Sequence, residues 1–60
     1  MLVEIQLIEN QRAWIYLHMI LLAIRISDDR VSIRYANDKE LIVELQEWNR
    51  IHSILTHMMN

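Results

Sequence analysis

Two neighbouring stretches in the middle of the chain alternate between apolar and polar residues. Within residues 30–35 the apolar positions are Val31, Ile33 and Tyr35, and each is separated from the next by a polar residue. After a turn-prone cluster at 37–39, residues 40–45 repeat the alternation with apolar residues at every second position from Leu41. Successive side chains of a strand point to opposite faces of a sheet, so this pattern predicts two half-buried strands joined as a hairpin.

The N-terminal part of the chain predicts a second hairpin. Val3, Ile5 and Leu7 alternate with polar residues, a polar group follows at 9–12, and Trp14 and Tyr16 continue the pattern. Residues 18–24 are apolar enough for a buried helix of two turns, and residues 27–29 interrupt the apolar pattern before the next strand. The C-terminal residues 46–59 favour a helix. The chain has no glycine and no proline, so its turns must rest on Asn, Asp and Ser.

An all-α alternative places helices at 2–26 and 38–59 with a connection at 27–37. The second half supports it, because apolar positions recur there at helical spacing. The first half argues against it, because Glu4, Gln11, His18 and Arg25 recur every seven residues in the middle of the would-be apolar face. We therefore favour a mainly β fold with a short helix and a helix-prone tail, and keep an all-α helix-hairpin dimer, acting as a partner-binding regulator or inhibitor, as the alternative.

The size and composition indicate that the chain pairs with another. A domain of 60 residues buries only about 60% of the surface that its unfolded chain exposes, so its stability alone is marginal. There is no cysteine to form a disulfide, and 53% of the residues are hydrophobic, which is more than a small monomer easily hides from water. Oligomerisation is the remaining source of stability, and we expect the protein not to be a monomer.

Charge and hydropathy exclude some classes of protein and disfavour others. A net charge of −2 does not indicate nucleic-acid binding, although it does not exclude it. The longest apolar stretch, residues 13–24, would form a helix of about 18 Å, which is too short for a membrane core of about 30 Å. Glu4 stands where a signal peptide carries positive charge. We expect no membrane association and a cytoplasmic location.

Several segments resemble the AbrB/MazE-like superfamily of swapped-hairpin DNA-binding domains, and MazE-type antitoxins most closely. Residues 10–17 resemble the turn and second strand of that family, and the pair Ile20 and Leu21 resembles the apolar pair of its short helix. Residues 29–33 and 41–44 are similar to its later strands, and residues 52–54 to the start of its toxin-binding segment. The resemblance extends over nearly the whole chain.

The resemblance implies a homodimer in which hairpins from two chains interleave into one β-barrel. Residues 1–45 would form this dimerisation and DNA-binding domain, and residues 46–60 a partner-binding tail. The protein would then be an antitoxin-like or AbrB-like transcriptional regulator, with operator DNA and a ribonuclease toxin as its partners. The operator would contact Asn10, Gln11 and Arg12, whose amides and guanidinium can reach phosphates and base edges. The residues expected to contact the toxin are those of the tail: Trp48, Ile51, His52, Ile54, Leu55 and Met58.

The residues with reactive side chains do not form a catalytic pattern. His52 and His57 would lie on different sides of a helix, and no cysteine joins them as a metal ligand. Asp28, Asp29 and Asp38 lie in turn segments, where adjacent acids usually cap and form turns. We therefore expect no enzymatic activity, no metal and no cofactor.

Overall fold

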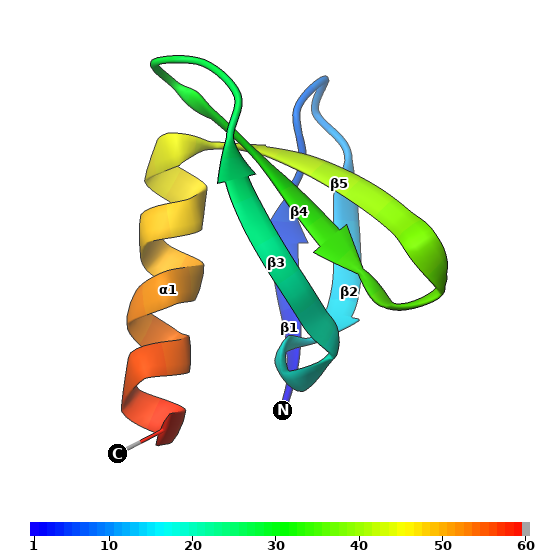
Figure 1. The fold of residues 1–60 in the computed structure, drawn as a ribbon, viewed down its shortest axis with the longest axis vertical. Helices are drawn as coiled ribbons and strands as arrows, with labels where there is room; N and C mark the ends of the chain where they lie inside the picture. The colour runs from blue at the N-terminus through cyan, green and yellow to red at the C-terminus, as the bar shows by residue number, and fades with distance from the viewer. Residues whose placement is uncertain (60) are drawn as a thin grey trace.

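The computed structural model describes residues 1–59. They form five β-strands, arranged in two small antiparallel sheets, and one C-terminal α-helix (Figure 1). The first sheet pairs β1 with β2, and the second has the order β3-β4-β5. The strands are β1 (Leu2–Gln6), β2 (Arg12–Tyr16), β3 (Ile20–Arg25), β4 (Arg30–Tyr35) and β5 (Lys39–Glu44). The helix α1 spans Leu45–Met59, and short 3-10 turns occur at Leu17–Met19 and Ala36–Asp38. The mainly β class with a C-terminal helix is confirmed, and the all-α alternative is wrong.

Both hairpins form where the alternation predicts them. In the second hairpin Val31 pairs with Val43 and Ile33 with Leu41, so the apolar positions of both strands lie on one face. In the first hairpin Val3 pairs with Ile15, and both point toward the core.

The prediction for the inner face of β2 is wrong by one residue. Ile15 is buried, whereas Trp14 and Tyr16 point outward and are 64% and 48% exposed. A shift of one residue moves every side chain of a strand to the opposite face, and the run from Ala13 to Leu17 offers apolar side chains in both phases. Pairing with β1 turns Ala13 and Ile15 inward in place of the bulkier Trp14 and Tyr16. Ala13 then lies opposite the fully buried Ile5.

Two pairs of residues with positive φ close the hairpins without glycine. Glu9 and Asn10 have φ near 62°, and Asn37 and Asp38 have φ of 66° and 59°. Two consecutive positive φ angles are the signature of the turn that best matches the twist of paired strands. Asn and Asp adopt this left-handed conformation more readily than other residues with a side chain, which explains three of the four positions.

The predicted helix at 18–24 is also wrong. Only Leu17–Met19 form a short 3-10 turn, and the rest of the segment is the strand β3, which pairs with β4 from Ile20 to Arg25. A short apolar run does not distinguish a buried helix from a strand, and here pairing decides, because β3 gives β4 a neighbour on its second side. As a result Ile33 of β4 is completely buried between two strands.

The core lies between the two sheets and α1. Figure 1 shows the helix running alongside the strands, with the β1–β2 hairpin behind the three-stranded sheet. Every element except β3 and the 3-10 turn at Ala36–Asp38 contributes at least one residue that is at most 3% exposed. These residues are Ile5, Ile15, Leu17, Val31, Ile33, Val43 and Ile51. The chain therefore builds one shared core that includes its C-terminal helix.

Candidate binding surfaces

The residues predicted to contact DNA lie together at the tip of the first hairpin. Asn10 belongs to the turn, Gln11 follows it, and Arg12 begins β2. All three are exposed. The backbone of Gln11 closes the turn, because its carbonyl accepts the N–H of Leu7 at 2.7 Å. Backbone groups thus close the turn, and contact of the three side chains with DNA stays a prediction.

The charges around this tip are of both signs. An open groove of about 520 Å³ runs from the turn to the start of α1, and Glu9, Glu44, Glu47 and Arg50 line it. Arg12 itself borders a shallower hollow that also holds Glu4 and Glu47. Binding to the DNA backbone depends on excess positive charge, so these carboxylates weaken the attraction for phosphate at the tip.

The residues predicted to bind a toxin lie on α1, which packs against the chain's own core. Ile51 is completely buried, and three others are partly buried against the core: Trp48, Ile54 and Leu55. His52 and Met58 are exposed, and the ring of His52 lies 5.7 Å from that of Trp48 between centroids. Only part of the predicted surface is therefore accessible while α1 stays in place.

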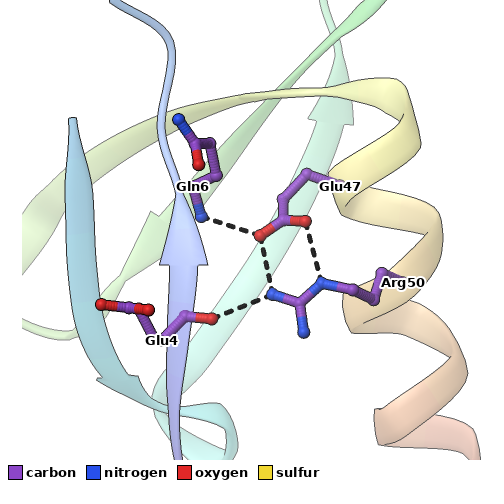
Figure 2. Close-up of polar contacts among 4 residues, drawn as sticks. All are labelled: Glu4, Gln6, Glu47 and Arg50. Atoms are coloured by element: carbon purple, nitrogen blue, oxygen red, sulfur yellow. Dashed lines mark hydrogen bonds and ion pairs between the residues drawn. The ribbon is translucent and has the colours of Figure 1, made fainter. Parts of the chain in front are cut away.

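Glu47 and Arg50 attach α1 to the outer edge of β1, as Figure 2 shows. Two bonds join the side chains, from Arg50 Nη2 to Glu47 Oε2 at 2.7 Å and from Arg50 Nε to Glu47 Oε1 at 2.9 Å. The same two groups bond to β1: the backbone N–H of Gln6 donates to Glu47 Oε2 at 2.7 Å, and Arg50 Nη2 donates to the Glu4 carbonyl at 2.9 Å. This Glu47–Arg50 clamp satisfies backbone groups that a neighbouring strand would otherwise pair.

The clamp perturbs both of its ionisable groups. The hydrogen bond from Arg50 is the main cause that lowers the pKa of Glu47 below its ordinary value of 4.5, with the Gln6 N–H acting in the same direction and partial burial opposing it. The same hydrogen bond raises the pKa of Arg50 further above its usual range. The charged forms are therefore the ones that the folded protein favours.

A row of exposed aliphatic side chains follows β3 and the residue after it. They are Leu21 at 63%, Leu22 at 46%, Ile24 at 53% and Ile26 at 51% exposed, and we refer to them as the β3 strip. β3 lies at the edge of its sheet and contains no acidic residue. Exposed apolar edge strands are templates for pairing with another chain, so the β3 strip is a candidate interaction surface.

Two negative findings concern the described residues 1–59. No three side chains of the His, Cys, Asp or Glu type come together there as a metal site. No helix in this part of the chain has the length and apolar character needed to cross a membrane.

Comparison of the chain with family models, with curated proteins and with solved structures finds no match.

Two of these surfaces do not follow from the sequence analysis. The spacing of Glu47 and Arg50 is that of facing residues on a helix, and this signal could have predicted their ion pair. Nothing in the spacing indicates that the pair also bonds to β1. The sequence does not indicate the β3 strip, because a short apolar run fits a buried helix as well as a strand.

Proposed function

We propose that this protein is a non-catalytic regulator that acts as a homodimer and binds a further macromolecule, of the type represented by the AbrB/MazE-like domains that its sequence resembles. The observation that carries the proposal is the β3 strip, four large aliphatic side chains about half exposed on an edge strand. A chain of 60 residues without disulfides gains most from covering such a surface with a second chain.

The magnitudes support association. Burying a whole Leu or Ile side chain contributes about 1.5–3 kcal/mol, so covering the exposed halves of four contributes about 3–6 kcal/mol for each protomer. Two protomers together gain about twice this amount, against an association cost of about 4–15 kcal/mol. The burial of both strips is therefore comparable in magnitude with the cost of association.

The resemblance implies a particular form of dimer, in which the β1–β2 hairpins are exchanged. The first hairpin forms its own two-stranded sheet and shares no strand ladder with β3-β4-β5, which is compatible with such an exchange. Hairpin exchange is the form of the dimer that the resemblance implies, and association through the β3 strip is the other form open to the same homodimer.

The binding of DNA and of a ribonuclease toxin remains part of the proposal on the strength of the resemblance. For DNA, the exposed tip residues Asn10, Gln11 and Arg12 are grouped at one end of a hairpin. For a toxin, the accessible positions on α1 are His52 and Met58. The mixed charge at the tip gives the DNA part less support than the homodimer has. The packing of α1 against the core does the same for the toxin part.

Sedimentation equilibrium of the purified chain tests the homodimer directly. We expect a mass of twice 7.3 kDa at micromolar concentration, and a monomer at every accessible concentration contradicts the proposal.

Fluorescence anisotropy at low salt, with a labelled duplex from upstream of the protein's own reading frame, tests the DNA part. Binding that Arg12→Ala abolishes supports it, and a flat titration contradicts it. Co-purification from the native host with a small ribonuclease tests the toxin part.

A further inference from the structure

The two sheets have four edges, and within residues 1–59 three of them make at least one hydrogen bond to another part of the chain. The Glu47–Arg50 clamp covers the edge of β1. At the edge of β2, the backbone N–H of Tyr16 donates to the hydroxyl of Tyr35 at 2.8 Å. At the edge of β5, the carbonyl of Ile42 accepts the N–H of Ile8 at 3.1 Å. The described chain has no corresponding bond at the outer edge of β3, so this edge remains to be covered.

The register of β3 identifies the backbone groups at this edge. The N–H of Ile26 donates to the carbonyl of Arg30 at 3.0 Å. Bonded and non-bonded pairs alternate along antiparallel strands, so Ile24 and Leu22 are the next residues that bond to β4. The N–H and carbonyl groups of Ala23 and Arg25 therefore point to the outer edge, available to another strand.

The side chains on this segment suit a two-fold axis at Ile24. A register shift separates Ile20 from Leu22, so the regular part of the strand begins at Leu22 and extends to Ile26, with Ile24 at its centre. In an antiparallel pair centred there, Ile24 faces Ile24 of the second copy, and Leu22 faces Ile26 of the second copy. All three side chains lie on one face and are 46–53% exposed, so each apolar group meets another.

A second copy fits this edge because a two-fold interface must be complementary to itself. Uncharged aliphatic side chains meet that condition, whereas a row of like charges does not. The one charged side chain of β3, Arg25, is directed to its own loop, where it donates to the carbonyls of Ser27 at 3.2 Å and Asp28 at 2.8 Å. A standard interface covers about 800 Å² on each partner. The chain exposes 4435 Å², of which the β3 strip is a concentrated apolar part.

We propose that two copies of this chain join β3 to β3 in antiparallel register about Ile24, forming one continuous six-stranded sheet. This inference rests on the proposed homodimer and specifies its interface. Each protomer keeps its own core, which distinguishes the arrangement from hairpin exchange.

Cross-linking of a single introduced cysteine tests the register. The chain has no cysteine of its own, so Ile24→Cys places one thiol on the proposed axis. Directly opposed residues of a non-bonded pair have Cα atoms about 4.5 Å apart, which a disulfide can span. We expect Ile24→Cys to form a covalent dimer under mild oxidation, and the control Ser53→Cys, exposed on α1, to remain monomeric on a denaturing gel.

A charge at the same position tests the contribution of the edge to affinity. Ile24→Lys places two ammonium groups face to face, and we expect the dimer dissociation constant to rise by about tenfold or more. The matched control is Trp14→Lys, which also replaces an exposed apolar side chain but lies on the other sheet, and should leave the constant unchanged. Circular dichroism verifies that both variants are folded, and the cysteine cross-link provides the answer where Ile24→Lys does not fold.

The outcomes separate this inference from the proposed function. A dimer that Ile24→Lys leaves intact and Ile24→Cys does not cross-link overturns the β3 pairing and leaves the homodimer standing, with hairpin exchange as its form. A wild-type chain that stays monomeric overturns both the β3 pairing and the proposed homodimer. The same conclusion holds if that monomer binds an added apolar peptide.

Discussion

The β1–β2 hairpin and the β4–β5 hairpin, called the first and the second hairpin here, match position by position but are stabilised in different ways. Ile5 of the first corresponds to Ile33 of the second, both completely buried, and both turns consist of two residues with positive φ. The second hairpin has a neighbouring strand, β3, along β4. The first is an isolated two-stranded sheet, whose edges bond instead to side chains from α1 and to the hydroxyl of Tyr35.

This difference indicates which half is the less stable. A lone two-stranded hairpin is marginal in water, whereas three strands with one apolar face can be stable. The first hairpin therefore depends on the Glu47–Arg50 clamp and on packing, and it also has a less favourable turn, because Glu9 occupies a position with φ of 62°. We expect local opening to begin in the first hairpin.

The largest expected effect comes from truncating the matched core residues. Ile33→Ala removes side-chain volume between two fixed strands, and we expect a cost of about 3–5 kcal/mol, against about 2–4 kcal/mol for Ile5→Ala, because the first hairpin can shift to fill the space. A core of this size supplies only about 3–5 kcal/mol in total, so Ile33→Ala should be largely unfolded. Circular dichroism without denaturant reports the folded fraction of Ile33→Ala, and urea titration at equal protein concentration measures Ile5→Ala. A greater loss for Ile5→Ala would contradict the comparison.

The next effect concerns the Glu47–Arg50 clamp. Glu47→Gln removes the charge from a hydrogen bond to the Gln6 backbone and from the pair with Arg50, and we expect a loss of about 1 kcal/mol, since both groups are partly exposed to solvent. Hydrogen exchange should accelerate at the Gln6 amide more than at amides of β4. Glu44→Gln, an exposed carboxylate on β5, is the matched control. Equal exchange in both variants would show that the clamp does not hold the first hairpin.

Acidification should act through the same carboxylate. The pKa of Glu47 is lower in the folded state than its ordinary value of 4.5, so the unfolded chain binds the proton more readily. The contribution of Glu47 is therefore fully present above pH 4.5 and is lost as the pH falls through the lowered folded-state pKa. Urea midpoints measured across this range should fall less steeply for Glu47→Gln than for the wild type, and parallel curves would contradict this assignment.

The smallest effect concerns the two turns. Glu9→Gly relieves a left-handed conformation that is costly for Glu, and we expect the protein to gain about 0.5–1 kcal/mol, since this conformation costs non-glycine residues about 1–2 kcal/mol. Asn37→Gly should gain only a few tenths of a kcal/mol, because Asn tolerates the same angles better. Thermal unfolding of the two variants compares them, and a larger gain for Asn37→Gly would reverse the expected ranking.

Local pattern was sufficient to predict the second hairpin, the inner residues of β1, the turn segments and the C-terminal helix. Each rests on a signal within a few residues: alternation for the strands, Asn and Asp for the left-handed turns, and helical spacing of apolar positions for α1. The three residues proposed to contact DNA lie together at one hairpin tip because they are adjacent in the sequence.

Tertiary structure alone decided the remaining features, because each depends on a partner distant in the chain. Residues 20–25 are apolar in either conformation, and only the edge of β4 makes them a strand. Trp14 and Ile15 are both apolar, and only pairing with β1 turns Ile15 inward. The proposed second chain, argued from size and hydrophobic content, likewise has a proposed contact surface only once the strands are paired. The β3 strip is exposed because β3 pairs on one side only, and a local pattern carries no information about which side of a strand remains without a neighbour.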